Sequence, residues 1–136
     1  MTFEEAIAAL GEEFGVELSA EDGKVSFEVS ADGGDFGPVN FTLTYQPETE
    51  MLLVSADAGV VDLEGGDAPL LKMLEANHMY SGTEGASFSL DGEHAKLERL
   101  ICLDAFWQEG GKSILMSLFR SVQAWREENG TSAEIE

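Results

Sequence analysis

Residues 69–104 read PLLKMLEANHMYSGTEGASFSLDGEHAKLERLICLD, and they are more informative about the fold than any other part of the chain. The first apolar residues of this segment recur at helical spacing: Leu70, Leu71 and Leu74. Pro69 lies in the first turn, where its missing N–H costs nothing, and Asp67 is close enough to cap that turn. The pattern predicts a short helix that ends at Asn77.

A β-hairpin is predicted after this helix. Gly82 and Gly85 bracket a turn, and apolar residues then alternate with Ser87, Ser89 and Asp91. The alternating apolar residues are Ala86, Phe88 and Leu90. Asp91-Gly92 turns the chain back, and the run from Leu97 to Leu103 is nearly all apolar, which predicts a strand covered on both faces.

The sequence before this segment predicts one helix and three strands. The helix has an apolar face made of Phe3, Ile7, Leu10 and Phe14, with Thr2 as a cap and Gly15 as a stop. The first two strands show apolar residues at alternate positions: Val25, Phe27 and Val29, then Phe41, Leu43 and Tyr45. Residues 51–58 form the third strand, and a short turn containing Pro47 makes the second and third strands a hairpin.

A long helix is predicted after Gly110 and Gly111. Its broad apolar stripe consists of Ile114, Leu115, Leu118, Phe119, Val122 and Trp125. Between Gly110 and Arg126 the chain has three bases, Lys112, Arg120 and Arg126, and no acid. This helix therefore either lies against the acidic remainder of the protein or presents its one basic face.

The predicted order is helix, three strands, helix, two strands, helix, with no βαβ alternation. This order is typical of an α+β domain, here a twisted antiparallel sheet of about five strands with the helices on one face. We expect a single domain over residues 1–129 and a short polar tail over residues 130–136.

The chain is strongly acidic, with 27 acidic and 7 basic residues among 136 and a formal net charge of −20. Nucleic acid is an unsuitable partner, because its recognition depends on basic patches that neutralise phosphates. The excess is concentrated in residues 1–68, which carry 16 acids and one base, whereas residues 69–136 carry 11 acids and six bases. The charge either keeps the surface solvated or attracts a basic partner.

Cys102 is the only cysteine, so no intrachain disulfide can form. Its apolar neighbours Ile101 and Leu103 predict a small core residue rather than a reactive thiol. No apolar run reaches the length of a membrane span, and the acidic N-terminus lacks the layout of a signal peptide. We expect a cytoplasmic protein with no membrane span.

No motif for catalysis or for a cofactor is recognisable. A Gly-x-Ser-x-Gly elbow is absent, and His78 and His94 both stand in polar, turn-like settings. Neither Cys-x-x-Cys nor His-Glu-x-x-His spacing is present for zinc, and the aspartate-containing glycine loops lack the calcium pattern of an EF-hand. Gly65-Gly66-Asp67 enters a helix, but Asp67 would repel phosphate. We therefore expect a protein that is not an enzyme and needs no metal or cofactor.

Soft and aromatic apolar residues suit an adaptable protein-binding surface. They are Met51, Met73, Met79, Met116, Phe88, Phe106 and Trp107. The alternative is that several of them belong to the core, because methionines on apolar helix faces are commonly buried.

Residues 69–104 resemble the class I type III secretion chaperones, the Tir chaperone family. The similarity rests on Leu70, Leu71, Leu74 and Glu75-Ala76-Asn77 in the middle helix, the glycine turn, the strand Ala86-Ser87-Phe88-Ser89-Leu90-Asp91 and the closing strand at residues 97–104. Phe14-Gly15 at the end of the first helix and Trp125-Arg126 near the end of the last also look like the family.

The resemblance implies a small acidic bacterial homodimer that binds the N-terminal segment of a secreted effector and keeps it competent for export, without catalysis. It implies a dimer interface at the middle helix and the last strand, formed by Leu70, Leu71, Met73, Leu74, Leu100, Ile101, Cys102 and Leu103. It implies an effector-binding groove along the first helix and early strands, for which the candidates are Phe3, Ile7, Phe27, Phe41 and Leu43, several of which must be core. The alternative is a regulatory or scaffold module of the same fold that is not tied to secretion.

Overall fold

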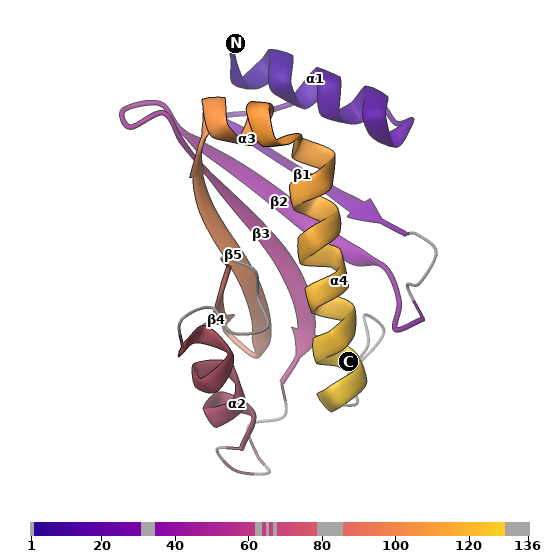
Figure 1. The fold of residues 1–136 in the computed structure, drawn as a ribbon, viewed down its shortest axis with the longest axis vertical. Coiled ribbons are helices and arrows are strands. Elements are labelled where there is room, and N and C mark those ends of the chain that lie inside the picture. Colours follow the sequence, from indigo (N-terminus) through magenta and orange to yellow (C-terminus); the bar gives the residue numbers. More distant parts are fainter. Residues whose placement is uncertain are drawn as a thin grey trace.

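The computed structural model describes residues 2–30, 35–61, 64, 66, 68–78 and 86–129. Within these residues the elements in chain order are (Figure 1) α1 (Phe3–Phe14), β1 (Lys24–Val29), β2 (Val39–Gln46), β3 (Met51–Val60), α2 (Ala68–Asn77), β4 (Ser87–Asp91), β5 (His94–Cys102), α3 (Leu103–Glu109) and α4 (Gly111–Asn129). The predicted α+β order is confirmed, with the short helix α3 added before the last helix. The predicted Asp67 cap, the turn between Gly82 and Gly85, and the tail at residues 130–136 lie outside the described residues.

The five strands form one antiparallel sheet in the order β1-β2-β3-β5-β4. The predicted hairpins β2–β3 and β4–β5 are both present, and Gly92 turns the second with a φ of 63°. Helix α4 runs along one face of the sheet, while α2 lies at the end of the molecule next to β4 (Figure 1). The edges of the sheet are therefore β1 and β4.

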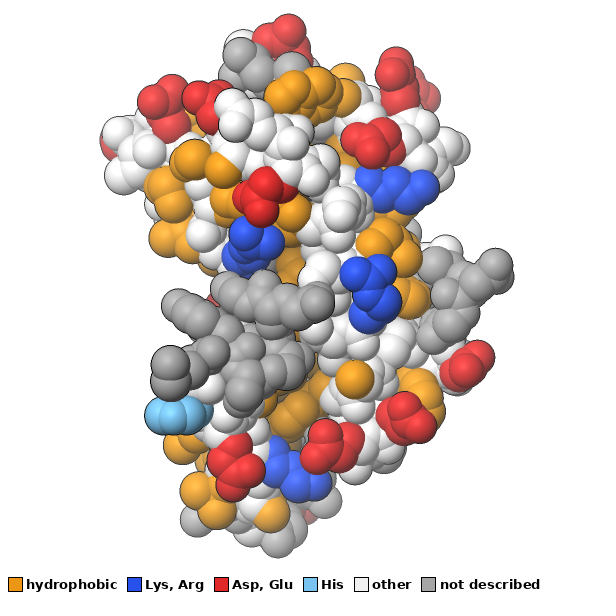
Figure 2. Space-filling model, viewed as in Figure 1, with side chains coloured by type: hydrophobic (Ala, Val, Ile, Leu, Met, Phe, Trp, Pro, Cys, Tyr) orange, Lys and Arg blue, Asp and Glu red, His pale blue; other side chains and the backbone are white. Residues whose placement is uncertain are grey.

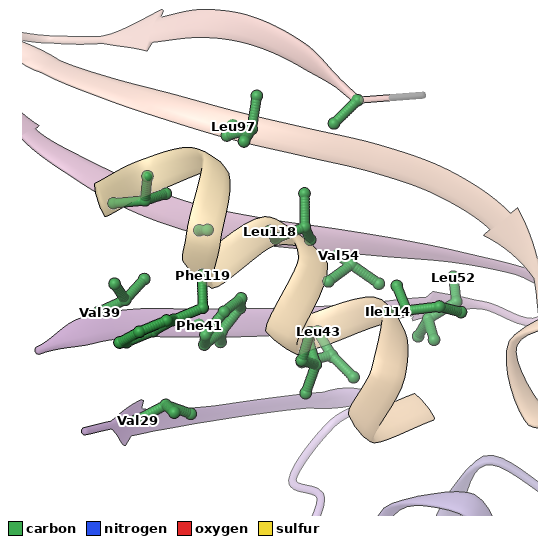
Figure 3. Close-up of a cluster of buried hydrophobic side chains, with 14 of the residues drawn as sticks. Val29, Val39, Phe41, Leu43, Leu52, Val54, Leu97, Ile114, Leu118 and Phe119 are labelled. Carbon is green, nitrogen blue, oxygen red and sulfur yellow. The ribbon is translucent and has the colours of Figure 1, made fainter. Parts of the chain in front are cut away.

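The core lies between the sheet and α4 (Figure 3). Alternate strand residues such as Phe41, Leu43 and Val54 are fully buried and meet Leu118 and Phe119 of α4. These positions follow the period of two in the strands and the apolar stripe of the helix. Burial of each large side chain stabilises the fold by about 1.5–3 kcal/mol.

Helix α1 begins and ends where the sequence predicts. The Thr2 hydroxyl accepts a hydrogen bond from the Glu5 N–H at 3.1 Å, and the Glu5 carboxylate accepts one from the Thr2 N–H at 3.0 Å. This reciprocal capping box satisfies two N–H groups that the first turn leaves open. Gly15 ends the helix in the left-handed conformation, with a φ of 71°, which only glycine adopts without strain.

The prediction that residues 97–103 form a strand covered on both faces is wrong for the single chain. Leu97 and Ile101 are buried under the helices, but Leu100 and Cys102 point to the opposite face and are exposed, Leu100 to 55%. Leu103 already belongs to α3. The prediction of Cys102 as a core residue is also wrong, because alternation along β5 places its side chain on the outer face.

The corner between α3 and α4 depends on two adjacent glycines. Gly110 has a φ of 90°, and a Cβ on Gly111 would lie 2.7 Å from the Phe106 ring. Phe106 is thereby packed against the start of α4 and is 1% exposed. The two glycines that the sequence assigns to the start of the last helix therefore also make the close turn from α3.

Candidate protein-binding surfaces

The two edges of the sheet differ in what covers their backbone. At β4, the Asn77 side chain at the end of α2 donates from Nδ2 to the Phe88 carbonyl at 3.0 Å, and the Phe88 N–H donates to Asn77 Oδ1 at 2.6 Å. This amide occupies both backbone groups of Phe88, as a neighbouring strand would. The Asn77 side chain therefore closes this edge to strand addition at Phe88.

The edge at β1 is open along Ser26 and Glu28. Lys24 exchanges two backbone hydrogen bonds with Glu21, on the side away from β2. Because backbone groups alternate in direction along an antiparallel strand, those of Ser26 and Glu28 face the same outer side. Among the described residues, neither is joined to another segment there. A recess of about 490 Å³ adjoins this edge, between residues 19–22 and the first half of β1. The edge offers unpaired N–H and C=O groups to an extended peptide.

Partly buried aromatic rings adjoin the open edge. The Phe27 ring lies 6.1 Å from that of Phe14 and 6.0 Å from that of Phe41, measured between centroids. Phe14 and Phe27 keep part of their area accessible, whereas Phe41 is fully buried. An extended segment beside β1 could therefore place apolar side chains against Phe14 and Phe27.

The five predicted groove residues have different positions. Phe3, Ile7, Phe41 and Leu43 are core residues with at most 2% of their area exposed, so they support the surface from beneath. Phe27 is the only one of the five that is partly rather than fully buried. Phe14, which the sequence assigned to the apolar face of the first helix, was not among the groove candidates, although its place one turn after Leu10 could have suggested it.

The predicted dimer residues fall on two exposed patches and in the core beneath them. Leu71 and Leu74 of α2 are 57% and 66% exposed, and Leu100 and Cys102 are exposed on β5. Leu70 is partly buried, and the remaining three are buried: Met73, Ile101 and Leu103.

The apolar patch on the outer face of the sheet extends beyond the residues that the sequence indicated. In the register of β3 and β5, Met51 lies opposite Cys102 and Leu53 lies opposite Leu100. Met51 and Leu53 are both partly buried. Pairing across strands gives the patch a second row of side chains, which sequence alone could not supply before the register was known.

Of the other apolar residues considered for adaptable contacts, Met73, Phe88 and Phe106 are buried and Trp107 is 42% exposed. Met51 and Met116 are partly buried, and Met79 lies outside the described residues. The face in Figure 2 shows acidic side chains scattered among hydrophobic ones, with few basic side chains. On this face the exposed hydrophobic side chains therefore lie in separate patches.

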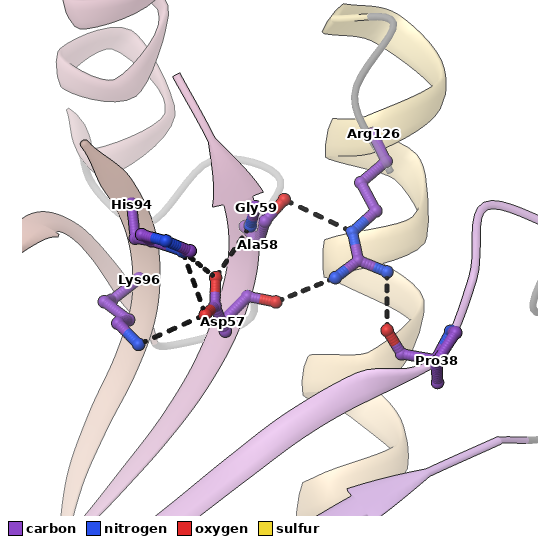
Figure 4. A network of polar contacts seen from close by, with 7 residues as sticks. All are labelled: Pro38, Asp57, Ala58, Gly59, His94, Lys96 and Arg126. Carbon is purple, nitrogen blue, oxygen red and sulfur yellow. Dashed lines mark hydrogen bonds and ion pairs between the residues drawn. The ribbon is translucent and has the colours of Figure 1, made fainter. Parts of the chain in front are cut away.

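A polar network joins β3 and β5 to α4 (Figure 4). The Asp57 carboxylate lies 3.1 Å from His94 Nδ1 and 3.3 Å from Lys96 Nζ, and it accepts a hydrogen bond from the Gly59 N–H at 2.8 Å. Burial acts to raise the pKa of Asp57, but the Gly59 hydrogen bond, His94 and Lys96 together hold it below the usual value. Asp57 is therefore ionised and fixed in place.

Arg126 is not part of a basic surface on the last helix, which was one of the two alternatives that the sequence left open. It is 1% exposed, and its guanidinium donates to five backbone carbonyls, those of Phe36, Gly37, Pro38, Asp57 and Ala58, at 2.9–3.2 Å. Burial lowers the pKa of Arg126, and the Asp57 charge opposes that shift. Only Lys112 and Arg120 remain as exposed bases of this helix. Arg126 therefore holds loop residues 36–38 to the sheet and α4.

The described residues contain no group of three or more His, Cys, Asp or Glu side chains that could hold a metal ion. In the same part of the chain no helix combines the length and apolar character needed to cross a membrane.

Comparison with known proteins identifies the family. The model of the Tir chaperone protein (CesT) family matches residues 5–126. The chain belongs to this family. The matched range runs from the first turn of α1 to Arg126 in α4, so the whole sheet lies within it. No curated protein sequence matches the chain.

Solved structures of low sequence identity share the fold. A chain of the ExsC–ExsE complex has a TM-score of 0.71 and 20% identity, with 95% of this chain and 97% of that chain covered. A chain of the HopA1–SchA chaperone–effector complex has a TM-score of 0.69 and 16% identity, with 92% and 93% covered. A chain of the heterodimeric ExoU–SpcU complex from the type III secretion system of Pseudomonas aeruginosa has a TM-score of 0.58 and 12% identity, with 93% of each chain covered.

Proposed function

We propose that this protein is a type III secretion chaperone that binds the N-terminal segment of an exported effector in the cytoplasm and keeps it extended. Membership of the Tir chaperone family over residues 5–126 is the observation that carries this proposal. The similar folds found in chaperone–effector and secretion-system complexes support it. Binding of this kind needs no catalytic group or cofactor.

The open edge of β1 supplies a physical means of holding such a segment. Ser26 and Glu28 offer backbone hydrogen bonds that do not depend on the sequence of the client. Phe14 and Phe27 offer accessible ring area to alternate side chains. A segment held in this way stays extended, because its own backbone groups are paired with β1.

We further propose that the chaperone is a homodimer. Leu71 and Leu74 of α2 and the outer-face residues Leu100 and Cys102 are apolar and exposed in the single chain. If a second copy covered these side chains, the removal of their apolar area from water would stabilise the dimer by about 25 cal/mol per Å². A twofold axis would bring the same patches of both copies together.

A regulatory or scaffold role outside secretion is the second candidate. The observation that favours it is the fold itself, which the protein shares with chains only 12–20% identical to it. A shared fold at such identity is compatible with different partners.

The identity of the bound partner distinguishes these two functions. The chain should be co-expressed with N-terminal segments of exported proteins encoded near its gene, and the complexes purified and measured by titration calorimetry. We expect one such segment to form a stable complex. Capture of resident cytoplasmic proteins alone, with no exported segment bound, would exclude the chaperone function.

A matched pair of variants locates the binding edge. Glu28→Pro removes an outward N–H that no strand of the described chain uses, and proline is tolerated at such edge positions. We expect it to weaken client binding about tenfold, the equivalent of one lost hydrogen bond of about 1.4 kcal/mol. Glu28→Gln removes the charge but keeps the N–H, and it should bind within about twofold of wild type if the backbone carries the contact.

A further inference from the structure

A pocket of about 540 Å³ lies between α4 and loop residues 35–36. Its apolar lining comes from Phe36, Met116, Phe119 and Ala124. Phe119 is buried, while Phe36 and Met116 are partly buried. The volume falls within the range of about 300–1,000 Å³ that is typical of ligand pockets, so it admits a short peptide segment.

The loop wall of this pocket is held in place by buried polar side chains. Gln123 is 7% exposed, accepts a hydrogen bond from the Phe36 N–H at 3.0 Å and donates one to the Gly37 carbonyl at 2.8 Å. Arg126 donates to the Phe36 and Gly37 carbonyls, each at 3.2 Å. Because these contacts already fix the loop, a ligand would not have to order it on binding.

Charged groups from α4 and from the loop belong to the lining of the pocket. Arg120 is exposed, and among the described residues it makes no hydrogen bond or ion pair, although the chain has 27 acids and only seven bases. Glu127 lies seven residues further along α4, which corresponds to about 10 Å at 1.5 Å per residue. Asp35 adds a second acid on the loop side. The pocket thus combines apolar lining residues with a cation and an anion about two helical turns apart.

We propose that this pocket anchors an extended client segment through one apolar side chain, with an acidic client residue at Arg120 and a basic one at Glu127. The inference rests on the proposed chaperone function and adds a second contact site to the β1 edge. Side chains two residues apart share one face of an extended chain, and four residues span about 13 Å. The matching pattern is therefore acidic, any, apolar, any, basic.

A photo-crosslinking experiment tests the pocket directly. The probe is the capped nonapeptide Gly-Ser-Asp-Thr-photoleucine-Thr-Lys-Ser-Gly, incubated with the full-length protein, irradiated and mapped by mass spectrometry. We expect saturable crosslinks to Met116, Ala124 or Phe36. Crosslinks confined to other elements, or no saturable crosslink up to millimolar peptide, would overturn the proposal.

Two protein variants and one control make the result specific. Ala124→Trp fills the pocket from an exposed position and should lower the crosslink yield about tenfold, the effect of about 1.4 kcal/mol. Ser113→Trp places the same side chain near the start of α4, outside the lining, and should leave the yield within twofold. Equal yields from both variants would contradict the inference. Circular dichroism and urea unfolding would confirm that both remain folded.

A charge exchange tests the orienting role of Arg120. Arg120→Glu should weaken binding of the Asp-containing peptide. It should strengthen binding of a peptide in which that Asp is replaced by Lys. No change for either peptide would refute the assignment of Arg120. If a true client binds Ala124→Trp and wild type equally well, the pocket inference fails while the chaperone function stands. If no exported segment binds wild type at all, the chaperone function itself fails.

Discussion

Replacing Arg126 by methionine should destabilise the protein by about 3 kcal/mol. The guanidinium donates to five carbonyls, but its Nη1 has two hydrogens for three of them, so at most four of these bonds exist at once. At about 1 kcal/mol net for each bond the loss is about 4 kcal/mol. Methionine removes the cost of burying a charge, which offsets part of that loss. It fills a similar volume, so a cavity contributes little.

Urea unfolding followed by circular dichroism measures this difference in the free energy of unfolding. Arg120→Met is the matched control, because it deletes an exposed guanidinium of the same helix and should change stability by less than about 0.5 kcal/mol. Arg126→Lys keeps the charge but lacks the planar fork, and it should lie between wild type and Arg126→Met. If Arg126→Met unfolds within about 1 kcal/mol of wild type, the network does not hold the loop in the manner described.

Two further predictions concern the acid network and the dimer. The folded-state pKa of Asp57 is lowered, so its contribution to stability is present above the ordinary aspartate pKa of about 3.9 and is lost as pH falls through the folded value. Asp57→Asn should therefore be less stable than wild type at pH 7, with a gap that narrows below about pH 4; a gap constant from pH 7 to pH 3 in urea unfolding would argue against this linkage. Light scattering of wild type should give twice the 14.7 kDa chain mass, and Leu74→Asp should give a monomer while the neighbouring Lys72→Asp stays dimeric. A wild-type monomer at micromolar concentration would contradict the proposed interface.

Elements with local signals could be predicted closely from the sequence. The capping residues Thr2 and Glu5 and the terminating residue Gly15 stand directly at the two ends of α1. The limits of this helix could therefore be predicted from the sequence. The two hairpins could be predicted for the same reason, because turn residues and the alternation of apolar and polar residues are also signals between near neighbours in sequence. Helix α3 was missed because its seven residues make only about two turns, which is too short for an apolar pattern to repeat clearly, and its N-cap residue, Cys102, makes no capping hydrogen bond.

The sequence pattern predicted which face of a strand or helix is apolar, but it did not predict how deeply each side chain is buried. Phe27 and Phe41 alternate with polar residues in the same way, yet Phe41 is fully buried and Phe27 only partly. The difference arises because β2 is an inner strand and β1 is an edge. Strand order depends on contacts distant in sequence, so periodicity could not separate core from groove residues.

The contacts of Arg126 could not be predicted from the sequence for a similar reason. Its partners lie 68–90 residues earlier in the chain. Its place four residues after Val122 and seven after Phe119 puts it on the apolar stripe of the helix, which could have indicated burial but not the carbonyls that it contacts. The family resemblance did include Trp125-Arg126, although the sequence did not show what the guanidinium contacts. The open backbone of Ser26 and Glu28 likewise became visible only with the register of β1.

Amide hydrogen exchange at β1 tests most directly whether an extended client adds to this sheet. The exchange rates of the Ser26, Phe27 and Glu28 amides should be measured by NMR with and without the N-terminal segment of a co-purified exported protein. Ser26 and Glu28 should exchange at least about tenfold more slowly in the complex, because a new strand would pair with their outward N–H groups. Phe27, whose N–H already faces β2, should change little. A bound client that leaves the Ser26 and Glu28 rates unchanged would contradict strand addition at β1.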